Sequence, residues 1–562
     1  MPQSDHNPIT GGQLVINTLR ALGADRVVGL PGQHALPLFD ALRGSDLQYY
    51  GARVENNAGF IADGAARTTG SPVPLLLSAG PGALTALPAL QEAAAASSPV
   101  LLIVAQVPES GIGGGVHGFL HELYDQRAHF RDTVKKTWSI RSVDQVIPMI
   151  TQAWQTAIAA PAGPVYVEIP YDVQIAVEQE PIAPTRAIEV FPTAPIVPNQ
   201  LLNIAADLLA AAKTPRIYAG GGVVRSGAAE ALHAISERLQ APVVTTFGGR
   251  SSFEWSHPLS AQGWIEDIDT TEFLEEADVL LVVGTGLGEL TTNYFTFRPK
   301  GKIIQIDADA SVLGRNYPSL GLAGDAKETL TAISSRLEMR LPSADPERRQ
   351  RALASIEQLV AGIHKRIDAQ SLQAEQQLIA DLRSAIPDQI GTYWDMTILA
   401  YWAWSAWDAR GGAFENAQCG GLGFGLPAAI GASFAGINGD NPLGTPTVAI
   451  SGDGGGLYSV ADLASLAQEN LNVTWVVFDD GGYGVLRGYM DAAFGDHVAT
   501  DLAVPDYVAL GAAFGIKSRR VEPAELHDAV AESISSQGPE IIVVPVAIEL
   551  FEPTHLNREP IL

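Results

Sequence analysis

The 562-residue sequence is poor in cysteine and in positive charge, and each shortage excludes something. Cys419 is the only cysteine, so a disulfide framework within the chain is excluded and a reducing, cytoplasmic setting is expected. Lysine and arginine together number 35 against 62 aspartates and glutamates, which gives a formal net charge of −27. This excess of acid argues against nucleic acid as a partner.

Long apolar runs are also missing. No uninterrupted apolar stretch reaches the roughly 18 residues that a membrane span needs, so no membrane association is expected. Residues 1–12 are polar and contain no apolar core of a signal peptide. Apolar residues nevertheless make up 46% of the chain, enough for the cores of about three or four domains of roughly 150 residues each.

Apolar runs that end in glycine turns alternate with helical patterns along most of the chain. This alternation predicts an α/β protein with mostly parallel sheets. A proline-rich linker at 178–198 and a charged helical connector at 335–375 divide the chain. We therefore expect three doubly wound domains, at 1–177, 195–335 and 376–552, the second of them Rossmann-like.

The stretch 448–484 carries the strongest chemical signal. A buried strand ends at Gly452 and Asp453, a helical segment follows, and a second buried strand ends at Asp479 and Asp480. Parallel strands of one sheet present their carboxyl ends on the same side, where α/β sheets bind ligands. Two carboxylates, a glycine turn and a helix N-terminus suit Mg²⁺ with a diphosphate, whereas the plainer alternative is two solvated acidic turns.

Several segments, taken together, resemble thiamine diphosphate-dependent enzymes. The GDG at 452–454 followed by DDGGYG at 479–484 is similar to that family's metal and diphosphate motif, and ARVENNAGFIADGAARTTG at 52–70 is similar to the region of its activating glutamate. LPGQHALPLFDAL, SAGPGALTAL and GGLGFGLPAAIGASFA also match family segments in order. The resemblance covers nearly the whole chain as pyrimidine-binding, middle and diphosphate-binding domains. It is nearest to the acetolactate synthase-like branch, with decarboxylases and aldehyde lyases nearby.

The resemblance implies thiamine diphosphate and Mg²⁺ as cofactors. It assigns the metal to Asp453, Asp480 and the main-chain oxygen of Gly482. Here the sequence departs from the family, because Asp479-Asp480 replaces Asn-Asn and adds negative charge beside an anionic diphosphate. Four further positions match residues that contact the diphosphate: Gly454, Gly455, Met396 and Thr397.

The same resemblance assigns the reactive end of the cofactor. Glu55 would face the aminopyrimidine ring, Leu422 would support the bent cofactor from below, and a carbonyl near Gly420 would accept from the amino group. Met or Ile is more usual at the position of Leu422. Tyr483 would line the mouth of the site together with Leu486 and Arg487. Without the resemblance, Glu55 reads as a surface glutamate and Leu422 as ordinary core.

Three residues are expected on the substrate side. Gln33 and His34 follow a Pro-Gly turn, and His34 matches a histidine that aldehyde lyases of the family use for proton transfer. His121 falls where relatives place Gln or His. A histidine titrates near neutral pH and could move protons at either position, although a structural histidine is the alternative for both.

The function implied is a lyase or carboligase that decarboxylates a small 2-oxo acid, with acyloin formation as an extension. The runner-up, supported by His34, is cleavage of a 2-hydroxy ketone without decarboxylation. Acetolactate synthase itself is disfavoured, because Tyr489 replaces a tryptophan and the arginine motif that contacts FAD is missing, so FAD is not expected. Family active sites lie between subunits, which implies a homodimer or homotetramer. Two other classes stay open: a non-catalytic relative, and a nicotinamide-dependent dehydrogenase that uses the middle domain.

Overall fold

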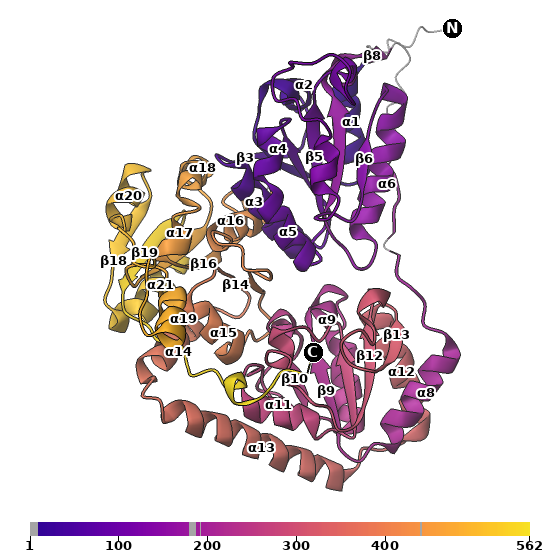
Figure 1. The fold of residues 1–562 in the computed structure, drawn as a ribbon, viewed down its shortest axis with the longest axis vertical. Coiled ribbons are helices and arrows are strands. Elements are labelled where there is room, and N and C mark those ends of the chain that lie inside the picture. The colour runs from indigo at the N-terminus through magenta and orange to yellow at the C-terminus, as the bar shows by residue number, and fades with distance from the viewer. Residues whose placement is uncertain (1–8, 179–186, 192, 439–440, 562) are drawn as a thin grey trace.

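The computed structural model describes residues 9–178, 187–191, 193–438 and 441–561. The polar N-terminal residues before Ile9 and much of the proline-rich segment at 178–198 lie outside the described residues. Three α/β domains follow one another along the chain, each built on a parallel sheet with helices on both faces (Figure 1). The predicted fold class is confirmed.

The first domain contains a six-stranded sheet in the order β3-β2-β4-β5-β7-β6. All neighbouring strands in it are parallel. Every residue of β4 and β5 is buried, as expected of strands covered on both faces. The strands are β2 (Arg26–Gly29), β3 (Gln48–Gly51), β4 (Val73–Leu77), β5 (Val100–Gln106), β6 (Thr137–Ser139) and β7 (Val165–Pro170). Its helices are α1 (Gly11–Ala21), α2 (Leu36–Asp40), α3 (Glu55–Thr69), α4 (Pro81–Thr85), α5 (Leu87–Ala95), α6 (Val146–Ile158) and α7 (Tyr171–Ile175). A short antiparallel pair, β1 (Ile9–Thr10) and β8 (Val177–Glu178), lies beside the sheet.

The third domain repeats this plan. Its sheet has the order β15-β14-β16-β17-β19-β18, the same path as in the first domain when the strands are numbered within each domain. The strands are β14 (Gly391–Trp394), β15 (Phe414–Asn416), β16 (Thr447–Gly452), β17 (Val473–Asp479), β18 (Lys517–Arg520) and β19 (Glu540–Pro545). Its helices are α14 (Gln373–Ala385), α15 (Ile398–Ala406), α16 (Gly425–Ala435), α17 (Asp453–Gly456), α18 (Leu463–Glu469), α19 (Gly484–Phe494), α20 (Tyr507–Ala513) and α21 (Leu526–Ser535).

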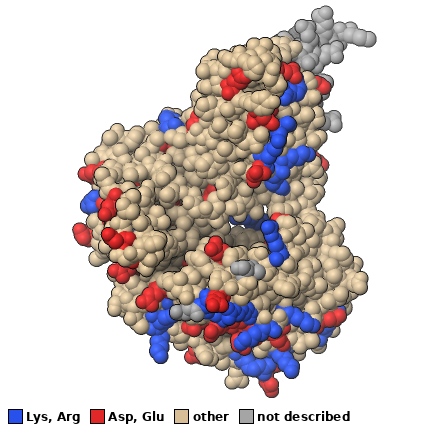
Figure 2. Space-filling model, in the orientation of Figure 1, with Lys and Arg blue, Asp and Glu red and all other residues tan. Residues whose placement is uncertain are grey.

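The middle domain has a five-stranded parallel sheet, β10-β9-β11-β12-β13. A one-residue parallel bridge from Val243 to Ser260 extends its edge, and with it the path matches the strand order of Rossmann domains. The strands are β9 (Pro215–Ala219), β10 (Val243–Thr245), β11 (Val279–Val283), β12 (Lys302–Asp307) and β13 (Leu320–Ala323). The helices are α8 (Asn199–Ala211), α9 (Gly221–Arg225), α10 (Ala229–Leu239), α11 (Ile268–Glu275) and α12 (Ala326–Arg340). The charged connector forms α13 (Pro346–Asp368), along which basic and acidic side chains gather at the lower edge in Figure 2.

Helices α3 and α16 pack against each other and join the first domain to the third. Glycines make this approach so close that side chains are excluded. A Cβ atom on Gly64 would lie 2.1 Å from the Ala428 oxygen, and one on Gly431 would lie 1.9 Å from the Ile61 oxygen. The small, amphipathic character of residues 56–69 is therefore explained by helix packing.

The last residues differ from the surface tail that their composition predicts. They return to the middle domain, where the Ile561 N–H donates to the Phe295 oxygen at 2.9 Å. Arg558 pairs with Glu275 at 3.0 Å, and the guanidinium group is mostly buried. Among the described residues, no helix combines the length and apolarity needed to cross a membrane.

Candidate active site

The site in the third domain begins where its strand order reverses, between β14 and β16. Asp395, Met396 and Thr397 follow β14, and Asp453 follows β16 directly. A Cβ atom on Gly452 would lie 3.1 Å from the Thr397 hydroxyl, so the two loops touch. This crevice is where doubly wound sheets bind ligands, and the structure brings the predicted Met396, Thr397 and Asp453 together there.

Asp453 has a buried carboxyl group whose two oxygens have no hydrogen-bond partner among the described residues. Its main-chain oxygen accepts from the Tyr507 hydroxyl at 2.5 Å, which holds the residue in place. Burial raises the pKa of Asp453, and the neighbouring carboxyl group of Asp480 raises it further. Burial also raises the pKa of Asp480. A buried carboxyl group without hydrogen-bond partners, beside a second, half-buried carboxyl group, has the chemistry of a divalent cation site.

The side chains of Asp479 and Asp480 point in different directions. The Asp479 carboxylate faces Arg520 at 3.4 Å, on the far edge of the sheet. Asp480 instead faces Asp453, and the guanidinium group of Arg487 lowers its pKa although burial prevails. Arg487 also donates to the Asp480 main-chain oxygen at 3.4 Å. Arg487 therefore offsets part of the charge that the departure from Asn-Asn adds.

The predicted glycines lie against the same group. A Cβ atom on Gly454 would lie 2.8 Å from the Tyr483 ring, and one on Gly455 would lie 3.2 Å from the Asp395 carboxylate. Gly482 forms an antiparallel bridge with Asp501, which fixes the loop after β17. The glycine turn after Asp453 therefore presents main chain only, with the Tyr483 ring and the Asp395 carboxylate packed against it.

The loop between β15 and α16 carries Gly420 and Leu422. Gly420 is exposed and has φ +85°, which favours glycine, and Leu422 is half-buried. Asp395 accepts hydrogen bonds from the Gly423 N–H at 3.0 and 3.1 Å. Burial raises the pKa of Asp395 to about 7. Sequence reasoning missed Asp395, although an acidic residue directly after a predicted strand is a signal that could have found it.

The substrate-side residues gather at the reversal point of the first sheet, between β2 and β4. His34 is buried and its ring centre lies 5.4 Å from that of His121. Burial lowers the pKa of His34, and His121 lowers it further. His121 has φ +66° and lies against Gly80, where a Cβ atom would be 2.6 Å from the His121 oxygen. Gln33 is exposed beside His34.

Glu55 lies at the same end of this sheet. The residue pattern at 47–54 predicts a strand that stops at Glu55, but β3 ends at Gly51, and Glu55 is the first residue of α3. Its Oε1 atom lies 3.3 Å from the position of a Cβ atom on Gly82, in α4, the short helix that follows β4. The structure therefore brings Glu55, His34 and His121 to one edge of the first domain.

These two groups of residues are not joined by hydrogen bonds within the described chain. The start of α3 contacts the third domain at a different residue, Asp462. The Asn57 side-chain amide donates to the Asp462 carboxylate at 2.6 Å, and the Arg53 main-chain N–H donates to it at 2.8 Å. Among the described residues, no hydrogen bond links Glu55 to Asp453. The predicted site residues therefore form two separate clusters, one in the first domain and one in the third.

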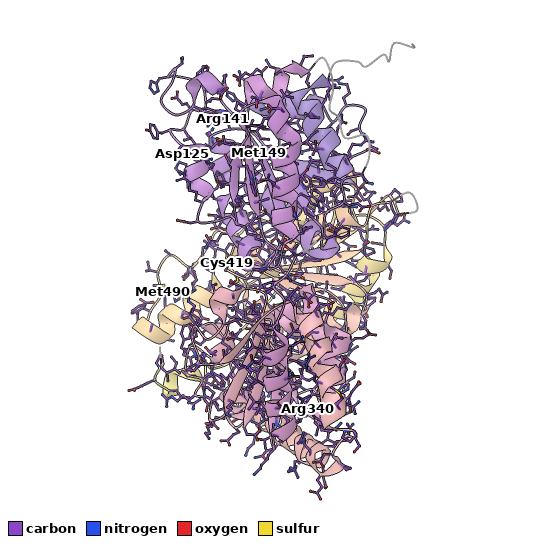
Figure 3. The ribbon with its side chains drawn as sticks, turned by 90° about the vertical axis from the view of Figure 1, so that its right-hand side faces the viewer. Asp125, Arg141, Met149, Arg340, Cys419 and Met490 are labelled. Carbon is purple, nitrogen blue, oxygen red and sulfur yellow. The ribbon has the colours of Figure 1, made fainter. Side chains whose placement is uncertain are left out.

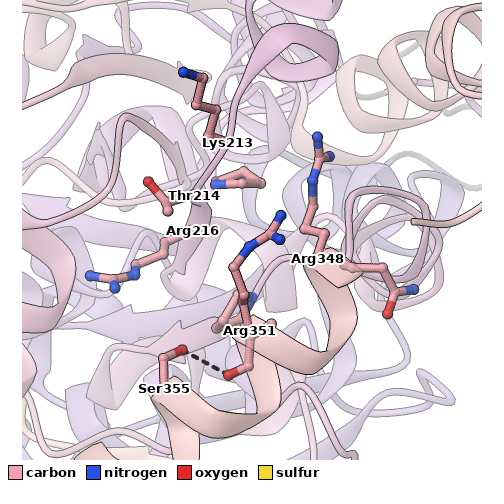
Figure 4. Close-up of a pocket in the computed structure, with 10 residues that line it drawn as sticks. Lys213, Thr214, Arg216, Arg348, Arg351 and Ser355 are labelled. Atoms are coloured by element: carbon pink, nitrogen blue, oxygen red, sulfur yellow. Dashed lines mark hydrogen bonds between the residues drawn. The ribbon is translucent and has the colours of Figure 1, made fainter. Parts of the chain in front are cut away.

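A further hollow of about 70 Å³ lies away from both groups, at the amino ends of β9 and β10 (Figure 4). The side chains of Lys213, Arg216, Arg348 and Arg351 surround it. Ligands of doubly wound sheets bind at the opposite, carboxyl edge, so this hollow is not the substrate site of the middle domain.

Comparisons with known proteins define the class of this protein. Residues 9–129, 202–333 and 395–544 match the N-terminal TPP binding, central and C-terminal TPP binding domains of thiamine pyrophosphate enzymes. These segments lie in the first, middle and third domains in that order. The chain belongs to the thiamine diphosphate-dependent enzyme family, and these domains support thiamine diphosphate as its cofactor.

Two kinds of relative stand out. A probable 2-ketoarginine decarboxylase of Pseudomonas aeruginosa is 33% identical over 94% of this chain and 92% of its own length. A probable acetolactate synthase large subunit of Methanococcus aeolicus is 29% identical over 95% of this chain and 91% of its own length. The large subunit of acetolactate synthase isozyme 1 of Escherichia coli is 28% identical over 97% of this chain. The predicted resemblance to the acetolactate synthase-like and decarboxylase branch is confirmed.

Proposed function

We propose that this protein decarboxylates a small 2-oxo acid with thiamine diphosphate and Mg²⁺, and can pass the resulting acyl group to a second carbonyl compound. The observation that carries the proposal is the buried, unpartnered carboxyl group of Asp453 beside Asp480 at the reversal point of the third sheet. A decarboxylase among the more similar relatives supports it.

The third domain would hold the cofactor's charged end. Asp453, Asp480 and the main-chain oxygen of Gly482 would bind Mg²⁺, and Gly454, Gly455, Met396 and Thr397 would contact the diphosphate. The unpartnered oxygens of Asp453 fit this role, since a buried carboxylate without donors requires a cation. When bound, thiamine diphosphate supplies the electron sink for the bond-breaking step.

The protein's own groups would position and move protons. Glu55 would hold a proton at the aminopyrimidine ring, Leu422 would support the bent cofactor, and the Gly420 oxygen would accept from its amino group. His34, with its pKa lowered by burial, suits a neutral base or hydrogen-bond partner of the substrate. His121 would face the same substrate from the other side, and Gln33 and Tyr483 would line the entrance.

The proposed assembly rests on the separation of the two clusters of site residues. We infer a homodimer or homotetramer in which Glu55 of one subunit serves the cofactor held by Asp453 of another. Hydrogen bonds hold the start of α3 against Asp462 of its own chain. This contact supports the inference that Glu55 serves a cofactor bound by another chain. Sedimentation of the active protein as a monomer would contradict this.

A second candidate function is cleavage of a 2-hydroxy ketone into two aldehydes, without loss of CO₂; the carbonyl half is released as the second aldehyde after its carbonyl carbon takes up a proton. The burial of His34 and its 5.4 Å spacing from His121 favour it, because such cleavage starts with removal of a hydroxyl proton.

Product identification separates the two candidates. The purified protein, with thiamine diphosphate and Mg²⁺, is incubated with a panel of 2-oxo acids and of 2-hydroxy ketones, and products are identified by mass and NMR. The panel includes the 2-oxo acid of arginine, the compound that the decarboxylase relative is named for. CO₂ release from a 2-oxo acid supports the leading proposal, and aldehyde formation only from hydroxy ketones supports the second.

A further inference from the structure

Glu92, on α5 of the first domain, forms hydrogen bonds with the third-domain loop that carries Gly420 and Leu422. Its side chain is fully buried. It accepts hydrogen bonds from the main-chain N–H groups of Gln418, Cys419 and Gly421, the last two at 3.2 and 3.3 Å. The Cys419 thiol donates to it as well, at 3.2 Å. Figure 3 shows Cys419 at the level where the first domain meets the other two.

A buried arginine supplies the positive charge that this carboxylate requires. Arg67 lies 3.5 Å from Glu92 and 2.7 Å from Asp63, and all three side chains are fully buried. Arg67 also pairs with Glu415 at 3.2 Å and donates to the Asn416 oxygen at 2.9 Å, both just before the loop. Charges buried in this way are stable only as a connected network, so Glu92 has a fixed position.

The loop is held from two sides. Glu92 accepts from N–H groups at 418–421, and Asp395 accepts from Gly423 on the other side of Leu422. With the N–H groups on both sides of Leu422 engaged, the peptide units of the loop cannot rotate independently. This arrangement fixes the direction of the Gly420 oxygen and the position of the Leu422 side chain.

We propose that Glu92 is a positioning residue that orders the 418–423 loop for the cofactor. The role of the ordered loop in cofactor binding rests on the proposed function, whereas the ordering of the loop by Glu92 does not. A bare interdomain contact would stabilise the protein without affecting cofactor affinity or the chemistry of the loop.

The reactivity of Cys419, the chain's only cysteine, tests the contact between Glu92 and the loop without any cofactor. Cys419 is an exposed residue, but partial burial of its thiol and the adjacent Glu92 carboxylate together raise the pKa of this thiol to about 12. The wild-type protein without cofactor should therefore react slowly with a thiol reagent such as DTNB at pH 8, with a rate that keeps rising beyond pH 10. A wild-type thiol that titrates near pH 9 would overturn the inference, even if no variant folds.

The variant Glu92→Gln keeps the side-chain volume and removes the charge. We expect Cys419 in it to react at least about tenfold faster at pH 8, since thiolate is the reactive form. We expect the Kd for thiamine diphosphate with Mg²⁺, measured by quenching of tryptophan fluorescence, to rise roughly tenfold or more. The conservative Glu92→Asp should restore part of both values.

Asp63→Asn is the matched control, because the Asp63 carboxylate accepts from Arg67 in the same buried network and, among the described residues, makes no hydrogen bond to the loop. We expect lower thermal stability from it, with thiol reactivity and cofactor Kd within about twofold of wild type. Unchanged cofactor affinity in Glu92→Gln, or an equal loss in Asp63→Asn, would overturn the positioning role. A wild-type protein that does not bind thiamine diphosphate would overturn the proposed function instead, while the thiol rates would still decide the loop contact.

Discussion

The carboxyl groups of Asp453 and Asp480 lie next to each other at the carboxyl ends of two adjacent parallel strands, and Asp480 adds to the rise that burial causes in the pKa of Asp453. Strand β16 pairs with β17 in register from Thr447–Val473 to Gly452–Phe478, which places the two residues after the strands side by side. A cation would relieve the repulsion between them. The relationship has direct consequences for metal binding.

Asp480→Asn should make Mg²⁺ binding less sensitive to pH. In the wild type, the raised pKa of Asp453 lets protons compete with the metal, so the affinity for Mg²⁺ should fall as the pH is lowered below neutral. With Asn at 480, the pKa of Asp453 falls towards its ordinary range. Titration calorimetry of Mg²⁺ with thiamine diphosphate at pH 5.5, 6.5 and 7.5 measures this. Asp479→Asn is the control, because Asp479 faces Arg520, and a larger effect from it would refute the assignment.

Leu422→Ala should lower kcat more than it raises the KM of the 2-oxo acid. Removing the support misplaces the reacting end of the cofactor, and a misplacement of about 1 Å can cost on the order of a hundredfold in rate. Leu422→Met and Leu422→Ile should stay within a few fold of wild type. Steady-state kinetics at saturating cofactor provides the comparison. Equal rates for Leu422→Ala and wild type would show that Leu422 is ordinary core.

His34→Ala and His121→Ala should each lower kcat/KM by roughly 10²- to 10⁴-fold, the usual contribution of a positioned acid or base. His117→Ala is the control, because the His117 side chain is 71% exposed and pairs with the surface residue Glu122 at 3.0 Å. The pH profile of kcat/KM distinguishes proton transfer from packing, since loss of a titrating group should remove one limb. A His117→Ala variant as impaired as the other two would contradict the placement of the site.

Glu266→Gln should stabilise the protein at pH 8 and have little effect at pH 5. Glu266 is buried, its pKa is raised to about 7 by burial, and Tyr294 donates to it at 3.1 Å. Because the folded state holds the proton more tightly than the unfolded state, stability is lost as the pH rises from about 4.5 to 7. The loss is on the order of 3 kcal/mol above pH 7, and Gln avoids it. Thermal melts of the variant and of the exposed Glu272→Gln across this pH range provide the test.

Local pattern was sufficient to predict the sheets and the positions of Asp453 and Asp480 after two neighbouring strands. Buried strands with glycine turns placed Asp453 and Asp480 at strand ends, because parallel strands leave few alternatives. The boundary at Glu55 was less accurate, because β3 ends at Gly51 and a short connection leads to α3. The composition of the last residues predicts an exposed tail, but Arg558 forms an ion pair with Glu275 of the middle domain, which is distant in sequence.

Contacts between domains could not be predicted from the sequence. Glu92 lies in an alanine-rich helix that looks like plain core, and its partners at 418–421 are main-chain groups, which leave no trace in residue type. The same is true of Arg67, whose partners Asp63 and Glu415 are 4 and 348 residues away. Hydrogen bonds from main-chain donors to a distant carboxylate become visible only in three dimensions.

The central claim is that Glu55 drives a thiamine diphosphate-dependent decarboxylation. The most direct test measures CO₂ release from the best 2-oxo acid of the panel, with and without cofactor, by wild type and Glu55→Gln. We predict release only with thiamine diphosphate and Mg²⁺, and a loss of at least about a hundredfold in Glu55→Gln with cofactor still bound. Equal release by the variant, or release by the wild type without thiamine diphosphate, would contradict the claim.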